Sequence, residues 1–366
     1  MPLLTVDDLS VTFTQRGERD VHAVDGVSFT VDEGQVVGLV GESGCGKSVT
    51  SLALMGLLPS RGVRVGGAAH LRLNGGSGAG TPDDTIPDQE QQGSVDLLAA
   101  DARRMRDLRG SQIAMVFQDP LSSLNPVVPL GLQVTEILTR HQGLRGEAAR
   151  TKAAELLERV GIPDPRRRLR EYPHQQSGGI RQRALIAMAV ACRPRLMIAD
   201  EPTTALDVTI QAQILELLKD LVHNEGTALL MITHDLGVVA GLCDGINVLY
   251  AGRVVEAGPR SALFAAPTHP YSVGLLHSIP RLDAPRGEPL TPIRGSINDN
   301  IAWNDGCAFA PRCDRYTEAC LEGPPELRHR SGEHLHRCVH PVGEGHQEGP
   351  ASGAGPAATS TMEGSG

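Results

Sequence analysis

The sequence predicts an α/β fold built on a mainly parallel sheet, and three observations support this. The β-branched run "QVVGLVG" at 35–41 ends in a glycine-rich loop, and helical spacing of apolar residues follows at 47–58. Alternating strand and helix patterns return between 195 and 258. Ahead of both, residues 4–34 alternate and turn as antiparallel strands do. We therefore expect a parallel core with an antiparallel β region before it.

Helix and strand signals place the later elements. "GEAARTKAAELLERVGI" at 146–162 is the clearest amphipathic helix, and "RQRALIAMAVACRP" at 181–194 is a second helix that ends at Pro194. The apolar strand "RLMIADEP" at 195–202 follows, and a helix at 209–226 precedes another strand, "ALLMITHD".

Composition divides the chain into parts. Residues 1–265 hold the core, with a helical subdomain at about 120–193 and a Gly-, Pro- and acid-rich surface insertion at about 75–94. Residues 266–340 shift toward Pro, His, Arg and Cys, which indicates a small cysteine-rich C-terminal domain. Residues 341–366 can bury almost nothing, so we expect a disordered tail.

Charge and hydropathy exclude some classes of protein. The net charge of −9 does not favour nonspecific binding to nucleic acid. The N-terminus has acidic residues where a secretory signal would be basic, and no apolar run approaches the roughly 20 residues that span a bilayer. We expect a cytosolic protein whose membrane role, if any, depends on a partner. A reducing cytosol disfavours disulfides among the seven cysteines of the chain, which favours metal binding by the C-terminal group.

The segment "GESGCGKS" has the spacing of a phosphate-binding loop and lies between the predicted strand and helix. Its glycines let backbone N–H groups curl around an anion, and the helix N-terminus adds its positive dipole end. Lys47 is predicted to reach the β- and γ-phosphates, and the Ser48 hydroxyl to coordinate Mg²⁺. A chance match is the alternative, which the strand–turn–helix context disfavours. The expected nucleotide contacts are Gly41, Glu42, Ser43, Gly44, Cys45, Gly46, Lys47, Ser48 and Val49, with Cys45 a tolerated small residue.

Two adjacent carboxylates, Asp200 and Glu201, follow the apolar strand at 195–202. Such a pair suits nucleotide hydrolysis, because one carboxylate can hold the magnesium shell while the other orients and polarises the attacking water. The alternative interpretation is a turn without a catalytic role. The presence of a phosphate-binding loop in the same chain disfavours it.

Four further segments follow in a fixed order, and each carries residues suited to a nucleotide site. They are "VFQDP" with Gln118, "QSGGIRQR" with Ser177, Gly178 and Gly179, "TTALD" with Asp207, and "MITHD" with His234. This set and order resembles the ATP-binding-cassette (ABC) ATPases over roughly residues 3–265, with Walker A, Q-loop, signature, Walker B, D-loop and H-loop all identifiable. The resemblance implies a RecA-like parallel sheet with an antiparallel β-subdomain and a helical subdomain.

The resemblance also implies roles for individual residues. Glu201 is the general base, Asp200 holds Mg²⁺, and His234 contacts the γ-phosphate. Gln118 is a second residue near the metal and links it and the water to the transport partner. Adenine stacks on an aromatic residue near the N-terminus, for which Phe13 is the candidate, and a core role for Phe13 is the alternative.

The signature departs from the usual L-S-G-G-Q pattern. Gln176 stands in place of Leu and Ile180 in place of Gln, while the Ser-Gly-Gly core at 177–179 is intact. A helix start with Ser and two glycines makes an anion-binding terminus. In the family this surface faces ATP on the opposite subunit, so two subunits sandwich two ATP molecules, with the D-loop residue Asp207 beside them. The departure puts in doubt the activity of the partner's site.

Beyond the cassette, "APTHPYSVGLLHSIP", "GCAFAPRCDRYTEACLEG" and "HRCVH" resemble the C-terminal extension of oligopeptide and dipeptide importer ATPases. Four thiolates suit either a [4Fe–4S] cluster or tetrahedral Zn²⁺. Gaps of five and six residues disfavour a simple zinc knuckle, and the resemblance favours the cluster, with Zn²⁺ or no metal as alternatives. Such a metal would stabilise a domain without its own core. The ligands would be Cys307, Cys313, Cys320 and Cys338.

The resemblance predicts the ATP-hydrolysing subunit of an importer for peptides or related small solutes. Expected partners are a second ABC ATPase, a paralogue rather than a copy, two transmembrane permease subunits and an extracytoplasmic solute-binding protein. The chain would lie at the cytoplasmic face of the membrane. Alternatives are a nickel-type importer of the same subfamily, a soluble cassette ATPase acting on nucleic acid or ribosomes, and a nucleotide-binding regulator without hydrolysis. The acidic charge and intact Glu201 and His234 argue against the last two.

Overall fold

The computed structural model describes most of the chain. The described ranges are 2–14, 20–73, 93–204, 206–278, 293–297 and 306–343. The predicted insertion at 75–94 and the predicted tail at 341–366 lie almost wholly outside the described residues.

The N-terminal part forms a four-stranded antiparallel sheet in the order β2-β1-β4-β5. β1 pairs on one side with β2, where Leu4 faces Val31, and on the other with β4, where Leu4 faces Leu71. This confirms the antiparallel prediction for the first two strands and adds two strands to them. The bounds are β1 Leu4–Phe13, β2 Val21–Val31, β4 Val63–Arg72 and β5 Ser94–Asp96.

An eight-stranded sheet in the order β11-β12-β10-β9-β3-β8-β7-β6 forms the centre of the molecule. The run from β6 to β9 is parallel, and β10 turns back antiparallel to β9. The bounds are β3 Val36–Val40, β6 Ile113–Val116, β7 Leu196–Asp200, β8 Ala228–Thr233, β9 Gly245–Tyr250 and β10 Arg253–Pro259.

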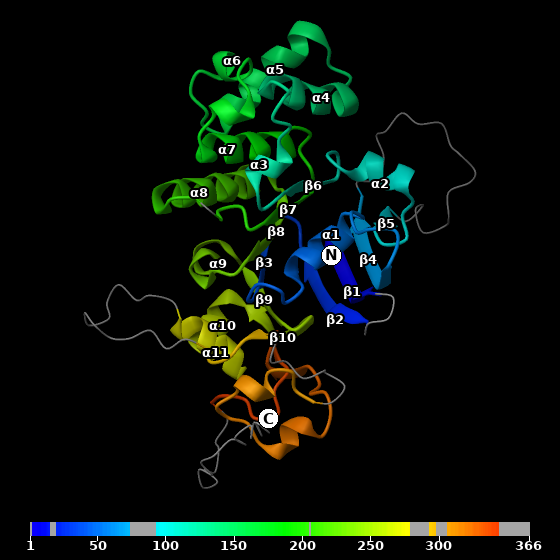
Figure 1. The fold of residues 1–366 in the computed structure, drawn as a ribbon, viewed down its shortest axis with the longest axis vertical. Coiled ribbons are helices and arrows are strands. Elements are labelled where there is room, and N and C mark those ends of the chain that lie inside the picture. Colours follow the sequence, from blue (N-terminus) through cyan, green and yellow to red (C-terminus); the bar gives the residue numbers. More distant parts are fainter. Residues whose placement is uncertain are drawn as a thin grey trace, which may run out of the picture.

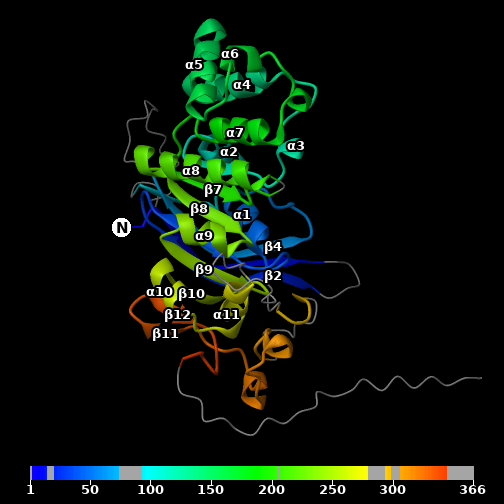
Figure 2. The same cartoon turned by 90° about the vertical axis from the view of Figure 1, so that its left-hand side faces the viewer.

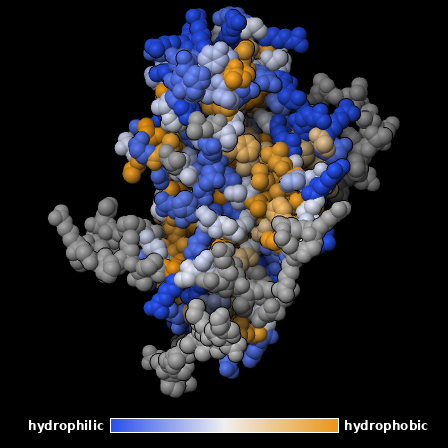
Figure 3. Space-filling view, in the orientation of Figure 1, coloured by the Kyte–Doolittle hydropathy of each residue, from blue (hydrophilic) through white to orange (hydrophobic). Residues whose placement is uncertain are grey.

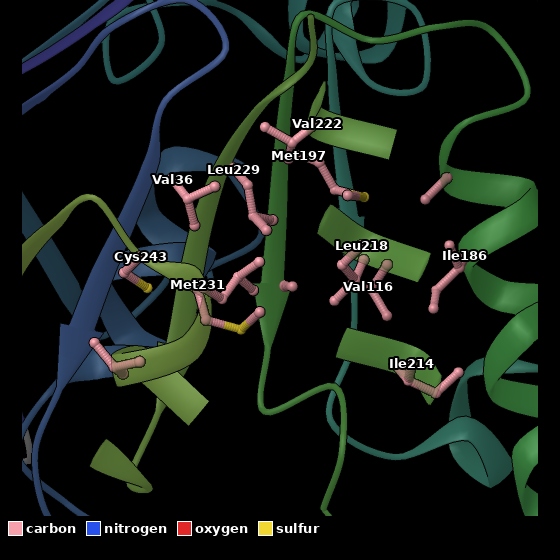
Figure 4. Close-up of a cluster of buried hydrophobic side chains, with 14 of the residues drawn as sticks. Val36, Val116, Ile186, Met197, Ile214, Leu218, Val222, Leu229, Met231 and Cys243 are labelled. Atoms are coloured by element: carbon pink, nitrogen blue, oxygen red, sulfur yellow. The ribbon is translucent and has the colours of Figure 1, made fainter. Parts of the chain in front are cut away.

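Alternate residues of the central strands supply two cores, one on each face of the sheet. Val36 and Val40 of β3 join one buried cluster with α-helical residues, whereas Val37 and Leu39 join the cluster under the N-terminal sheet. Figure 4 shows the first cluster, with Ile186 and Leu218 facing the strands. Burial on both faces explains why these strands read as unbroken apolar runs rather than as alternating ones.

Helices flank the central sheet, and a helical subdomain lies at one end of the molecule (Figure 1). Figure 2 shows α8 and α9 lying over the central strands. The flanking helices are α1 Lys47–Leu54, α2 Ala102–Leu108, α8 Val208–Glu225, α9 Leu236–Leu242 and α10 Arg260–Ala265. The subdomain contains α3 Pro120–Ser123, α4 Leu130–Gln142, α5 Gly146–Arg159, α6 Pro165–Arg168, the short 3-10 helix η2 Pro173–Gln175 and α7 Gly178–Ala189.

The predicted helix at 146–162 shows how sequence spacing places an element. Ala149, Ala153, Leu156 and Leu157 recur at helical spacing and are all buried, so α5 packs one apolar stripe inward. In the space-filling view, hydrophilic residues dominate the helical subdomain, and apolar residues gather near α1 and β4 (Figure 3). Within the described residues, no helix has the length and apolar character needed to cross a membrane.

The C-terminal region, described over 306–343, is joined to the cassette. β12 pairs with β10, with His336 opposite Glu256, so it extends the central sheet. Cys307, Phe309 and Cys320 belong to the same buried cluster as the helical subdomain. A separate cysteine-rich domain without a core is therefore not supported, because the region shares the core of the cassette. Its elements are η5 Ala310–Arg312, η6 Glu318–Leu321, β11 Arg328–Ser331 and β12 His334–His336, preceded by α11 Pro270–His277.

Candidate functional site

The loop between β3 and α1 has the shape that its glycines allow. Gly44 and Gly46 have φ of 84° and 104°, in the left-handed region that other residues rarely adopt. A Cβ added to Gly46 would lie 2.3 Å from the Ala23 carbonyl oxygen, and one on Gly41 would lie 2.2 Å from that of Leu249. Glycine is therefore required at both ends of the loop, since neighbouring backbone fills the space.

The Lys47 ammonium lies inside this loop. Its Nζ donates to the Gly41 carbonyl oxygen at 2.7 Å and to the Glu42 carbonyl oxygen at 2.9 Å, and the residue is buried. An ammonium has three donors, so phosphate oxygens entering the loop can share or replace these partners. The position is the one predicted for the phosphate-binding lysine.

Asp200, at the end of β7, faces the start of α1. Ser48 Oγ donates to its Oδ1 at 3.1 Å, and Ser51 Oγ donates to Oδ2 at 3.3 Å. Burial raises the pKa of the Asp200 carboxyl, and the hydrogen bond from Ser48 opposes this shift. A hydroxyl and a desolvated carboxylate are hard oxygen ligands of the kind that Mg²⁺ takes, so this pair fits the predicted ion.

The Glu201 carboxylate is held from three sides. Gln118 Nε2 and Thr204 Oγ1 each donate to its Oε2 at 2.9 Å, and His234 Nδ1 lies 3.2 Å from Oε1. Glu201 itself has φ of 46°, a strained conformation for a side-chain-bearing residue. The structure thus brings together Glu201, Gln118 and His234, which lie on three separate segments of the sequence.

Two supporting residues were not predicted from the sequence. Ser51 lies one helical turn after Ser48, and Thr204 lies three residues after Glu201. Both hydroxyls bond to the predicted carboxylates. Their spacing from the motif residues was the available signal, although a hydroxyl at i+3 is common in loops and helices.

The signature and D-loop residues are helix caps at the surface. Ser177 caps α7 by accepting a hydrogen bond from the Ile180 amide at 3.4 Å, and Asp207 caps α8 by accepting one from the Ile210 amide at 3.0 Å. Both caps are exposed, as is Gly178. The position of Gly179 is tight, because an added Cβ would lie 2.8 Å from the Ile210 side chain. These residues form a second polar surface apart from the Walker contacts above.

The unusual Gln176 has a local structural role. It is buried, its Nε2 donates to Glu171 Oε2 at 2.5 Å, and Arg168 donates to its Oε1 at 3.2 Å. Its amide is therefore satisfied inside the subdomain, where a leucine would leave Arg168 and Glu171 to pair alone. Ile180 is partly buried against the core.

Phe13 lies at the end of β1. It is partly buried and packs against the core beneath the N-terminal sheet. This position is compatible with the core role and leaves one part of the ring accessible.

The four C-terminal cysteines line one small cavity of about 10 Å³. Burial raises the pKa of Cys307 to about 11, and that of Cys313 and Cys338 to about 12, so these thiols are protonated at neutral pH. A volume of this size holds about one water-sized sphere, not a four-iron cube. Among the described residues, no group of three or more His, Cys, Asp or Glu side chains is placed to hold a metal ion. The residues as arranged do not fit the predicted cluster or Zn²⁺.

Comparison with known proteins identifies the family. Residues 24–204 match the ABC transporter family, and residues 255–320 match the family described as oligopeptide/dipeptide transporter, C-terminal region. The oligopeptide transport ATP-binding protein OppD of Salmonella typhimurium is 46% identical over 342 residues, which cover 93% of this chain and 95% of that protein. The chain belongs to the ABC transporter family. It is an ABC ATPase of the group that carries this C-terminal region.

Other relatives agree with this assignment. The dipeptide transport ATP-binding protein DppD of Bacillus subtilis is 46% identical over 336 residues, covering 92% of this chain and 94% of that protein. Among solved structures, the ATP-binding cassette MJ0796, a dimer bound to ADP and Pi, matches with a TM-score of 0.58 and 25% identity. That match covers 70% of this chain and 98% of the cassette, so the ABC fold accounts for the larger part of the molecule.

Proposed function

We propose that this ABC ATPase hydrolyses ATP to power the import of peptides through membrane permease subunits. The observation that carries the proposal is the joint match of the cassette and the C-terminal region, with relatives named for oligopeptide and dipeptide transport aligned over more than nine-tenths of the chain. The acidic net charge of −9 gives nucleic acid no advantage as a partner.

The Walker residues supply the chemistry of hydrolysis. Lys47 and the loop amides of residues 41–48 bind the phosphates, and Phe13 offers its accessible ring edge to the adenine. Ser48 and Asp200 would hold Mg²⁺, which neutralises phosphate charge when bound. Gln118 also faces this site and would join the ion to the helical subdomain.

Glu201 is the proposed general base. Its carboxylate accepts hydrogen bonds from Gln118 and Thr204 on Oε2, which fixes its orientation. Oε1 lies 3.2 Å from His234 Nδ1, and the carboxylate would take a proton from the attacking water. His234, half-exposed at 54%, is positioned to contact the γ-phosphate from the solvent side.

The exposed caps Ser177 and Asp207, with Gly178 and Gly179, would complete the ATP site of a second ATPase subunit. Exposure of these polar helix starts supports the idea, because an anion on a second subunit can reach them. The altered signature favours a paralogue as that subunit. The chain would then sit at the cytoplasmic face of the membrane, bound to two permeases that receive peptides from a solute-binding protein.

The decisive experiment is reconstitution of the chain with a second ABC ATPase, two permease subunits and a solute-binding protein. We expect ATP hydrolysis that rises when the binding protein carries a peptide. In this complex Glu201→Gln should retain ATP and lose turnover by at least about 100-fold, because the amide cannot accept the proton.

Two results would contradict the proposal. Unchanged hydrolysis by Glu201→Gln would remove Glu201 as the base. Stimulation by a nickel chelate, or by RNA, with none by peptides would replace the peptide as the transported or bound solute.

A metal on Cys307, Cys313, Cys320 and Cys338 is a separate hypothesis. Convergence of the four thiols on one cavity supports it, and the small cavity volume weighs against a [4Fe–4S] cluster. Anaerobic purification followed by quantification of iron, sulfide and zinc per chain tests it. About four irons, or one zinc, per chain would support the hypothesis and would require the thiols to rearrange around the metal, whereas no metal would end it.

A further inference from the structure

An arginine of the C-terminal region contacts the Walker A loop. Arg312 ends η5 and lies directly before Cys313, yet its guanidinium contacts Glu42, 270 residues earlier in the chain. Nη1 donates to Glu42 Oε2 at 2.8 Å, and Nη2 donates to Oε1 at 3.0 Å. This is a two-pronged pairing of the guanidinium with both carboxylate oxygens, the strongest geometry available to an ion pair.

The Arg312 side chain is buried and is held by contacts other than Glu42. It is only 3% exposed, whereas the Glu42 side chain is 29% exposed. Nε donates to the Arg294 carbonyl oxygen at 2.8 Å, and the guanidinium lies over the rings of Tyr250 and Phe309 at 5.7 and 5.8 Å. Because a buried guanidinium is costly without partners, this pocket is built to present the charge to Glu42.

A second contact from the same region holds the same loop residue. The Glu42 amide donates to the hydroxyl of Tyr271 at 2.8 Å. Tyr271 lies on α11 and is fully buried against Tyr250 and Phe309. Both the side chain and the backbone of Glu42 are thus held by residues that follow the cassette.

We propose that Arg312 is a positioning residue of the ATP site. It holds Glu42 so that the carbonyls of Gly41 and Glu42 keep the Lys47 ammonium in place and the loop keeps its phosphate-binding shape. Nucleotide affinity then depends on whether the C-terminal region is docked. The inference rests on ATP binding by the cassette and not on the identity of the transported solute.

The test is a double-mutant cycle on the full chain, with ATP affinity measured by equilibrium titration. Arg312→Gln and Glu42→Gln are each expected to raise the Kd for ATP about tenfold, the effect of losing one charge-assisted contact. The double variant should match the single variants, because both substitutions remove the same interaction. Arg312→Lys, which keeps the charge and loses the second prong, should fall between wild type and Arg312→Gln.

Arg294→Gln is the matched control. Its side chain is 87% exposed in the same region and pairs only loosely with Asp314 at 3.9 Å, so its ATP affinity should equal that of wild type. Thermal unfolding of each variant separates loss of folding from loss of positioning. If Arg312→Gln fails to fold, Arg312→Lys carries the test, because it keeps a positive charge beside Glu42 and loses only the two-pronged contact.

Three outcomes would overturn the proposal. One is wild-type ATP affinity in folded Arg312→Gln or in Glu42→Gln. Another is additive effects in the double variant, which would mean that Glu42 acts on the nucleotide independently. The third is a fall in melting temperature with no change in Kd, which would leave the ion pair with a purely structural role.

Discussion

The two polar surfaces of this cassette differ in how far one chain completes them. The Walker surface is closed: Lys47, Asp200 and Glu201 are buried, and each has hydrogen-bond partners inside the same chain. The signature surface is open, since Ser177 and Asp207 are exposed and use their side chains to cap their own helices. The sequence motifs identify both surfaces equally well, but the two surfaces differ in the burial of their residues and in what those residues bind.

The difference indicates where each surface obtains its binding partners. A buried lysine or carboxylate must be paired within the fold, so the Walker residues are organised before any ligand arrives. A helix start with an exposed cap can remain hydrated and wait for an anion from outside. We therefore expect substitutions at the Walker surface to act on this chain alone, and those at the signature surface to act only after assembly.

The largest effect should come from Lys47→Ala. Removing two or three charge-assisted contacts to phosphate is expected to weaken ATP binding by about 100-fold or more in the isolated chain. Lys152→Ala is the matched control, because that lysine pairs with Glu155 at the surface at 2.9 Å. Equilibrium binding of a fluorescent ATP analogue measures both. Equal ATP affinity of Lys47→Ala and Lys152→Ala would contradict the proposal that the buried Walker residues bind ATP within one chain.

A smaller effect is expected at Ser177. Ser177→Asp keeps a good helix cap but places a negative charge where the partner's phosphate would approach. ATP affinity and melting temperature of the isolated chain should be unchanged, while ATP hydrolysis by the assembled complex should fall at least about tenfold. Ser177→Thr, which keeps both the cap and the hydroxyl, serves as the control. If Ser177→Asp weakened ATP binding by the isolated chain, the two surfaces would belong to one site in one chain.

The smallest effect should come from Gln176→Leu, which restores the residue usual in the family signature. The change removes hydrogen bonds to Glu171 and Arg168 but buries a well-packed apolar side chain, so the free energy of unfolding should change by about 1 kcal/mol or less. Hydrolysis by the complex should stay within about twofold, because the Gln176 amide is already occupied inside the subdomain. Denaturant unfolding and a steady-state assay test this. A several-fold gain in hydrolysis would show that Gln176 limits the partner's site.

Much of the cassette could be predicted because its signals are local. The spacing in "GESGCGKS" requires glycine where Leu249 and Ala23 approach, and the apolar strand before Asp200 fixes where that carboxylate emerges. The antiparallel strands at 4–13 and 21–31 followed from alternation in the same way. Strands β4 and β5 were not predicted. β4 pairs with β1 and β5 pairs with β4, so their place in the sheet depends on these partners rather than on their own pattern.

The C-terminal region was predicted less well. Its composition indicated a separate cysteine-rich domain, and the resemblance favoured a cluster on its four cysteines. Instead, β12 pairs with β10, and Cys307 and Phe309 pack into the core of the cassette. The region is therefore not an independent domain, because part of its apolar surface is buried in the core of the cassette.

The sequence by itself determined the fold class, the family and the residues that we propose handle ATP, because these depend on short motifs whose chemistry is carried by neighbouring residues. Only the tertiary structure decided how Glu201 meets Gln118 and His234 and how Arg312 meets Glu42. The residues of these pairs lie far apart in the sequence and on different elements. Their contact is set by packing of the whole chain, which no local pattern encodes.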